Sequence, residues 1–422
     1  MSEFDKIIGY KDVKEELMRI CDVVKNTQKY KDLGVNHVGG LLLDGEPGVG
    51  KTLMATCFIK ESGRKAFICR KDKPNGEFVN EIKKIFKEAS ENTPSIVFLD
   101  DMDKFANEDA TRPDAQEYVT VQSCIDECKD KDVFVIATIN KNRMPNSLLR
   151  AGRFDFKIGI DVPEREDAKE IIKYYLSQKK NVEDVSAEDV AKLLYGKSCA
   201  TLESVINIAA QYSGYFNKNK IDIEDITKAA LRVIYNAPEC SIPRNKTELK
   251  KIAFHEAGHT VVAEMLEEGS VNFVTTRKYM GSAAGITSLY NSEDYWISIK
   301  KMENRVLSIL GGKAATEIIF GEVDTGCGSD ITRARGIVYR FLAEYGGCGF
   351  EFTDNGSETT NIIASKIEDR VSIELEKYYL KAKEILFKNK DFLEVLAQRL
   401  QEKDTLLEPE ILEIKRKTCN NK

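Results

Sequence analysis

The chain has 422 residues, of which 42% are hydrophobic and 31% are charged, and its formal net charge is −6. This composition is typical of a globular protein, and the length is sufficient for two or three domains. The acidic balance argues against nucleic acid or an anionic membrane surface as the main partner.

Neither the cysteines nor the apolar runs indicate secretion or membrane insertion. The ten cysteines have no paired spacing, so we expect free thiols in a reducing compartment. The longest apolar runs, such as 133–139, are far too short to cross a bilayer, and the first residues do not form a signal peptide. We therefore predict a cytoplasmic protein with no membrane segment in this chain.

The first motif along the chain is a nucleotide-binding loop. Residues 45–52 have the sequence Gly-Glu-Pro-Gly-Val-Gly-Lys-Thr, which fits the P-loop pattern G-x-x-x-x-G-K-T. A short apolar run precedes it and a helix-compatible run follows it, so the motif has the strand–loop–helix context that it needs. In such a loop the backbone N–H groups wrap the phosphates, Lys51 neutralises phosphate charge, and the Thr52 hydroxyl binds Mg²⁺.

Two further predicted strands carry polar residues at their ends. Strand 95–99 is followed by Asp100, the expected Mg²⁺ partner, and strand 133–139 is followed by Asn140, a candidate for orienting the attacking water. Taken alone, Asp100 would be better interpreted as a cap after a strand. The P-loop on the same chain favours the catalytic interpretation.

Two arginines, Arg150 and Arg153, follow in the segment 149–155. They are candidates for stabilising phosphate charge on a neighbouring subunit, as arginine fingers do. Without the P-loop they would be interpreted as ordinary surface charges. The residues that we predict to bind ATP and Mg²⁺ are Ile8, Gly45, Glu46, Pro47, Gly48, Val49, Gly50, Lys51, Thr52 and Asp100.

From about residue 163 the pattern becomes helical. Helix-like segments cover 164–179, 186–194, 201–212 and 223–235. They predict a small helical domain after the nucleotide-binding half. Residues 237–243 contain two prolines and are typical of a linker.

The second motif is a metal-binding helix. Residues 255–259 are His-Glu-Ala-Gly-His, the H-E-x-x-H pattern of zinc metalloproteases. Residues i and i+4 share one face of a helix, so both imidazoles can reach one metal, with Glu256 beside it to take a proton from a metal-bound water. The alternative is a pair of surface histidines on an amphipathic helix. Gly258 costs about 1 kcal/mol relative to alanine in a helix, so we expect another element to pack closely there.

The third zinc ligand is left open by the spacing. A catalytic zinc usually has three protein ligands and one water. The remaining histidine, His37, lies in the nucleotide-binding half, so a downstream carboxylate is expected. Glu317 in the segment 311–321 and Asp330 at the start of a predicted helix are both candidates. Either acid could instead cap a helix or support a ligand.

This order of motifs resembles the FtsH family of AAA+ metalloproteases. The likeness extends from about residue 4 to at least residue 350. It is carried by the P-loop, by 149–155, by 255–259, by 311–321 and by 328–330. The resemblance implies an α/β P-loop AAA+ ATPase domain with a small helical lid, followed by a mainly α-helical zinc metalloprotease domain. The expected boundaries are 1–162 for the large nucleotide-binding domain, 163–240 for the lid and 241–422 for the metalloprotease domain.

The resemblance also implies roles for individual residues. The family's third zinc ligand matches Asp330, so Glu317 is expected to support a ligand rather than to bind the metal. The family's ring implies a homohexamer in which Arg150 and Arg153 act on the ATP of a neighbouring subunit. The stretch 279–289 resembles the family's edge strand beside the cleft, to which a substrate can add by strand pairing.

The chain departs from the family pattern in four places. Family members normally carry an N-terminal membrane anchor, whereas this chain begins at the ATPase domain, so we expect a soluble enzyme. Asp101 stands where the family has a catalytic glutamate, and a misplacement of about 1 Å can cost about 10²-fold in rate. The aromatic pore loop falls on 73–76, which has no aromatic residue, although Phe78 is near. The lid motif is replaced at 196–202 by Gly-Lys-Ser-Cys-Ala-Thr-Leu.

The leading hypothesis is an ATP-dependent zinc endopeptidase in which an ATPase ring feeds protein substrates to the zinc site. It needs Zn²⁺, ATP and Mg²⁺, and its catalytic residues are Glu256 at the zinc and Asp101, Asn140, Arg150 and Arg153 at the nucleotide. One alternative is a metalloprotease whose ATPase ring is weak or mainly structural. The other is a ring-shaped remodeller or chaperone that does not cleave.

Overall fold

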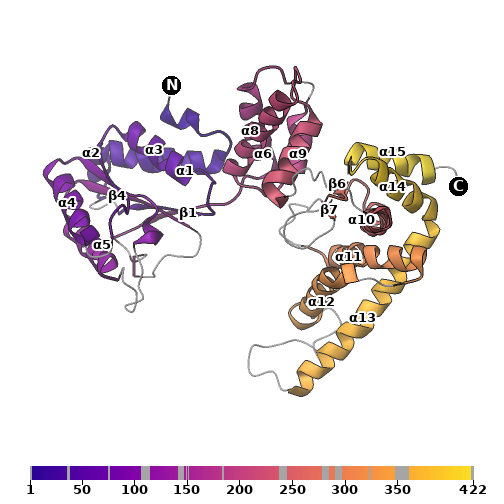
Figure 1. Cartoon of the computed structure of the whole chain (residues 1–422). Coiled ribbons are helices and arrows are strands. Elements are labelled where there is room, and N and C mark those ends of the chain that lie inside the picture. The colour runs from indigo at the N-terminus through magenta and orange to yellow at the C-terminus, as the bar shows by residue number, and fades with distance from the viewer. Residues whose placement is uncertain are drawn as a thin grey trace. The chain divides into compact units, whose positions relative to one another are not determined.

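The structure is a computed structural model. It describes residues 2–35, 39–74, 77–105, 115–140, 147–148, 150, 152–182, 185–236, 245–277, 285–289, 297–322, 325–346 and 361–419, with only the backbone for 361–364. The chain forms two compact units, Met1–Ile223 and Glu224–Lys422 (Figure 1). The domain boundaries at 162 and 240 stay predictions.

The first unit is built on a five-stranded parallel sheet. Its strand order is β2-β3-β4-β1-β5, with β1 Leu41–Gly45, β2 Lys65–Cys69, β3 Ser95–Leu99, β4 Val133–Asn140 and β5 Phe156–Ile160. The apolar runs of β1 and β3 are buried at every position, as expected for parallel strands covered on both faces. The register sets Gly45 opposite Asn140 and Leu99 opposite Ala137. The polar residues that end these strands therefore gather at one edge of the sheet.

Helices cover both faces of this sheet (Figure 1). Successive residues of β4 point to opposite faces, because the side-chain period of a strand is two. Phe134 stacks on Phe58 of α3, whereas Val133 and Val135 belong to the core formed with α4 and α5. The helical elements of this part are η1 Glu3–Lys6, α1 Lys11–Lys25, α2 Thr27–Lys31, α3 Lys51–Ser62, α4 Glu77–Glu91, η2 Met102–Lys104 and α5 Ala115–Glu127.

Three helices follow the sheet in the first unit: α6 Arg165–Ser177, α7 Ala187–Leu193 and α8 Cys199–Tyr215. Ser186 caps α7 and Ser198 caps α8, each through a side-chain oxygen that accepts from the backbone N–H three residues later. Helix α8 begins directly against the P-loop, since the backbone N–H of Ala200 donates to the carbonyl of Gly48 at 3.0 Å. The altered lid motif thus still contacts the nucleotide-binding loop.

The second unit is mainly α-helical, which confirms the predicted fold class. Helix α9 spans Ile223–Tyr235 and belongs to this unit except for its first residue. The other helical elements of the unit are α10 Lys246–Leu266, α11 Ile299–Phe320, η3 Thr325–Cys327, α12 Gly328–Ala343, α13 Asn361–Lys388, α14 Lys390–Glu402 and α15 Glu408–Cys419. A small antiparallel sheet has the order β7-β6-β8, with β6 Val271–Thr275, β7 Ile286–Leu289 and β8 Thr405–Leu407. None of the helices in the described ranges is both long enough and apolar enough to span a bilayer.

Helices α10 and α11 cross in very close contact. A Cβ atom at Gly258 would lie 2.4 Å from the carbonyl oxygen of Gly311 and 2.5 Å from Cβ of Ala315. In turn, a Cβ atom at Gly311 would lie 2.5 Å from the carbonyl oxygen of Gly258. The predicted close packing at Gly258 is confirmed, and it sets how deeply α11 approaches the two histidines of α10.

Candidate functional site

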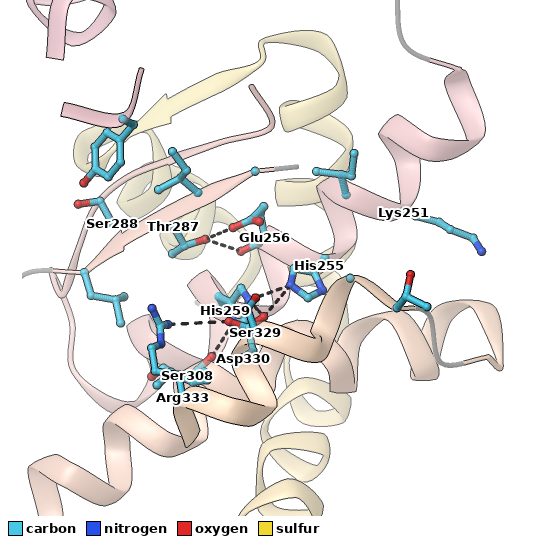
Figure 2. A pocket seen from close by; sticks show the side chains of 18 of the residues that line it. Lys251, His255, Glu256, His259, Thr287, Ser288, Ser308, Ser329, Asp330 and Arg333 are labelled. Carbon is cyan, nitrogen blue, oxygen red and sulfur yellow. Dashed lines mark hydrogen bonds and ion pairs between the residues drawn. The ribbon is translucent and has the colours of Figure 1, made fainter. Parts of the chain in front are cut away.

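Two histidines and one aspartate converge in the second unit (Figure 2). His255 and His259 lie one turn apart on α10, and Asp330 lies in the first turn of α12. The two Nε2 atoms are 3.1 Å apart, and Oδ2 of Asp330 lies 3.1 Å from His255 Nε2 and 3.4 Å from His259 Nε2. Of the two carboxylates that spacing left open, Asp330 is the one that meets the histidines.

Helix α11 fixes the orientation of the buried histidine. Nδ1 of His259 lies 2.8 Å from the carbonyl oxygen of Ser308, so Nδ1 carries the proton and Nε2 keeps its lone pair for the cluster. A Cβ atom at Gly312 would lie 2.5 Å from Nε2 of His259 and 2.8 Å from Cε1 of His255. Only a glycine at position 312 lets α11 come this close to both rings.

The cluster has strongly coupled charges. Burial opposes ionisation of Asp330, but the hydrogen bonds and charges of the two histidines outweigh it and hold the pKa of Asp330 below its usual range. Burial favours the neutral ring of His259, but the hydrogen bond and charge of Asp330 raise the pKa of that ring. A proton is therefore held more readily by His259, and a metal cation that binds to this ring must displace it.

Glu256 lies on the same turn of α10 and is held by the segment that contains β7. Its Oε2 accepts a hydrogen bond of 2.7 Å from the Thr287 hydroxyl. A Cβ atom at Gly285 would lie 2.6 Å from Cγ of Glu256, so a side chain there would push the carboxylate away. Sequence analysis missed both Gly285 and Thr287. The signal that could have found them was their position in the segment expected beside the cleft.

The cluster and Glu256 open into a cleft of about 930 Å³. Residues 285–289 form one wall of this cleft, where Figure 2 shows Thr287 and Ser288. Among the described strands, β7 is one of the two at the edges of its sheet. The predicted edge strand is confirmed for β7, and residues 278–284 lie outside the described part of the chain. A cleft of this size matches the upper range of ligand pockets, about 300–1,000 Å³.

Glu317 lies away from the histidines, within a separate polar group. Its carboxylate accepts hydrogen bonds from Lys383 at 2.7 Å, from Lys313 at 3.3 Å and from Tyr379. The hydrogen bonds from Lys383 and Tyr379 lower the pKa of Glu317 to about 2. These contacts join α11 to α13 and correct the expectation that Glu317 supports a metal ligand. His37 lies outside the described residues.

The P-loop, Asp100 and Asn140 also come together, in the first unit. The P-loop connects β1 to α3, and Gly48 and Gly50 have φ of +81° and +100°, which favour glycine. Nζ of Lys51 donates to the carbonyl oxygens of Gly45 and Glu46 at 2.8 Å and to Oδ1 of Asn140 at 3.3 Å. Ile8 lies between η1 and α1.

Asp100 is 1% exposed and lies at the centre of a polar network. Its Oδ1 accepts from the hydroxyls of Thr52 at 3.1 Å and Thr138 at 2.9 Å. Its Oδ2 accepts two hydrogen bonds from the guanidinium of Arg70, of which the one from Nε is 2.9 Å long. Arg70 and Thr138 were not anticipated from the sequence, because neither belongs to a motif.

Asp101 directs its carboxylate to Lys104 of η2, at 2.7 Å, while its backbone N–H donates to the hydroxyl of Thr138. Its φ of +52° is unusual for a residue other than glycine. Asn140 donates through Nδ2 to Asp103 at 3.1 Å. Asp101, the candidate base, and Asn140, the candidate for orienting water, therefore both form hydrogen bonds with neighbouring side chains.

The two candidate finger arginines differ in their surroundings. Arg153 forms two hydrogen bonds to Asp126, of 3.1 and 2.7 Å, and lowers the pKa of Asp126 to about 2. Arg150 is exposed. Near the expected pore loop, Phe78 is buried against Phe105, so Phe78 does not supply an exposed aromatic side chain. Residues 75–76 lie outside the described part of the chain.

Comparison with known proteins bears on both units. Residues 41–162 match the model of the ATPase family associated with various cellular activities (AAA), and residues 243–414 match that of peptidase family M41. The chain is 30% identical to the ATP-dependent zinc metalloprotease FtsH of Bacillus subtilis over 435 residues, which cover 96% of this chain and 68% of the relative. It is also 30% identical to the ATP-dependent zinc metalloprotease FtsH 2 of a Thermoanaerobacter species, over 97% of this chain and 82% of the relative.

Proposed function

The chain belongs to the FtsH family of ATP-dependent zinc metalloproteases, and from this premise we propose that His255, His259 and Asp330 hold the zinc and that Glu256 is the general base of peptide hydrolysis. One observation carries this proposal. Zinc bonds of about 2.0–2.1 Å in tetrahedral geometry set neighbouring ligand atoms about 3.3 Å apart. The three ligand atoms of the cluster are 3.1, 3.1 and 3.4 Å apart.

The residues around the cluster support distinct roles in the reaction. His255, His259 and Asp330 would hold a zinc ion, which would polarise the scissile carbonyl and make water a better nucleophile. Glu256 accepts the proton of that water and passes it to the leaving amine. Thr287 keeps the carboxylate of Glu256 in place through its 2.7 Å hydrogen bond. Ser308 keeps His259 in the tautomer whose Nε2 can bind a metal.

The substrate is an extended polypeptide that adds to β7. Within the described ranges this edge strand pairs with β6 alone, and it forms a wall of the cleft that contains Glu256. Strand addition uses main-chain hydrogen bonds, so it accepts many sequences. The substrate class is therefore protein, with selection left to the side-chain subsites of the cleft.

The variant Glu256→Gln tests the assignment of the base. It removes the proton acceptor but keeps the size of the side chain, so it should retain zinc and lose cleavage of an unfolded protein. The matched control is Glu267→Gln, at the exposed end of the same helix, which should cleave like the wild type. Cleavage retained by Glu256→Gln would remove this residue from the mechanism.

The first unit would bind and hydrolyse ATP with Mg²⁺. Lys51 and the P-loop amides bind the phosphates, and Asp100 and Thr52 offer oxygen ligands to Mg²⁺. The contact of 3.1 Å between the Thr52 hydroxyl and Asp100 supports this pair. Asp101 is the candidate base and Asn140 the candidate for orienting water. ATP turnover by Lys51→Ala equal to that of the wild type would contradict these assignments.

The chain would act as a homohexamer. The exposure of Arg150 supports a role for that arginine at the ATP of a neighbouring subunit, whereas Arg153 must first leave Asp126 to do the same. Sedimentation with ATP and Mg²⁺ should give a particle of six chains. A particle that stays monomeric under these conditions would contradict the ring.

The eight cysteines within the described ranges are free thiols, which supports a reducing compartment such as the cytoplasm. Cell fractionation with an antibody to the chain is the direct test. Recovery in an oxidising compartment would contradict this localisation.

A further inference from the structure

Two arginines share the cleft with the metal cluster. Arg305 lies on α11, three residues before Ser308, and Arg333 lies on α12, three residues after Asp330. Residues three apart share a helix face, so each arginine is adjacent to a group that holds the metal cluster. Both side chains line the cleft, and Arg333 lies beside Asp330 in Figure 2.

Neither guanidinium is matched by a carboxylate of its own in the described part of the chain. Arg305 has no ion pair or hydrogen bond there, and Arg333 is 4.0 Å from Oδ1 of Asp330, whose other oxygen faces both histidines. Other basic residues nearby are paired: Lys251 with Glu322 at 2.5 Å, and Arg335 with Glu368. Arg305 and Arg333 therefore lack a carboxylate partner of their own, whereas Lys251 and Arg335 each have one.

The two arginines also repel each other. Partial desolvation at the wall of the cleft, together with repulsion from Arg333 and Arg340, lowers the pKa of Arg305. An arginine stays charged under these conditions. Two like charges that have no carboxylate of their own favour an anionic ligand, which relieves their repulsion.

The charge of the occupied site points the same way. Zinc is balanced by Asp330 and Glu256, and the other two charged residues of the lining, Glu248 and Lys251, balance each other. Arg305 and Arg333 therefore leave the occupied cleft positive by two charges. A guanidinium binds a carboxylate through two parallel hydrogen bonds, which gives directional as well as electrostatic preference. A peptide that enters this cleft brings carboxylates only through Asp, Glu or its C-terminus.

We propose that Arg305 and Arg333 form a subsite that binds a side-chain carboxylate of the substrate and directs cleavage to bonds near Asp or Glu. This inference rests on the proposed peptidase function of the same cleft. An acidic side chain is favoured over the C-terminus because β7 supports binding of a continuous strand. The expected preference is about five- to tenfold, between the effect of an exposed ion pair and that of a charged hydrogen bond.

The test uses the full chain with zinc and pairs of fluorogenic peptides that differ only in Glu or Gln at one position. Positions up to three residues on either side of the scissile bond are scanned, and each peptide is made with a free and an amidated C-terminus. We expect kcat/KM to be about five- to tenfold higher for Glu at one position. The preference should fall as ionic strength rises.

The variants Arg305→Gln and Arg333→Gln should bring the Glu/Gln ratio towards one, whereas Arg305→Lys should keep part of it. The matched control is Arg335→Gln, on α12 but outside the cleft lining, which should keep the full ratio. Zinc content confirms that each variant is folded. A ratio near one in the wild type, a ratio retained in the double variant, or a preference that depends on the free C-terminus would each overturn the inference.

Binding of the same peptides to Glu256→Gln separates this inference from the proposed function. A Glu preference in binding, measured by fluorescence anisotropy, combined with no hydrolysis by the wild type, would support the subsite and overturn the peptidase assignment. Hydrolysis by the wild type without any Glu preference would overturn the subsite alone.

Discussion

Replacing Gly312 with alanine adds one methyl group directly against the metal ligands. The new Cβ would lie 2.5 Å from Nε2 and 2.7 Å from Cε1 of His259, and 2.8 Å from Cε1 of His255. Non-bonded heavy atoms are comfortable at about 3.5–4.0 Å, so the rings must retreat by about 1 Å. Zinc sites tolerate deviations of only about 0.2 Å.

A shift several times larger than the tolerance should detach at least one histidine. We expect zinc affinity to fall at least about 100-fold, which is about 2.7 kcal/mol. Without the clash, alanine would favour the helix by about 0.5–1 kcal/mol over glycine. The substitution therefore separates the local clash from helix propensity, since the two effects have opposite signs.

The assay is competition for zinc with a chelator, followed by thermal unfolding with and without zinc. The matched control is Gly336→Ala in α12, where an added Cβ has no heavy atom within 4 Å. Gly336→Ala should bind zinc normally and unfold at an equal or higher temperature. Zinc affinity and cleavage of Gly312→Ala equal to those of the wild type would refute the account of how α11 holds the rings.

Three further predictions concern the two sites and the polar group around Glu317. Thr287→Val removes the hydroxyl that donates to Glu256, so kcat should fall about tenfold while zinc content stays constant, and an unchanged pre-steady-state rate would contradict this role. Asp101→Glu restores one methylene and should raise ATP turnover about 10- to 100-fold if reach is the limitation, and phosphate release measures it. Glu317→Gln should lower the free energy of unfolding at pH 7 by about 1–2 kcal/mol, a value reduced to allow for the partial exposure of this side chain. Because the pKa of Glu317 is depressed from 4.5 to about 2, its stabilisation is full above about pH 5 and disappears as the pH falls towards 2. Urea unfolding of the zinc-free proteins should therefore show a difference at pH 7 that vanishes near pH 2, and a constant difference would contradict the ion pairing.

The sequence by itself determined the features that depend on near neighbours in the chain. The P-loop is eight consecutive residues between a strand and a helix, and its chemistry is fixed by its own backbone and side chains. His255 and His259 share a helix face because of their four-residue spacing alone. Gly258 in that helix was sufficient to predict a close approach by another element.

Only the tertiary structure decided which distant groups join these motifs. Asp330 meets His255 across 75 residues of sequence, whereas Glu317, which looked equally suitable from spacing, turns towards α13. Arg153 is bound to Asp126, and Arg305 and Arg333 come from two helices to one cleft. The physical reason is that these groups lie far apart in the sequence and meet only through the packing of separate elements. The close approach of α10 to α11, for example, depends on contacts between Gly258 and Gly311 rather than on local preference.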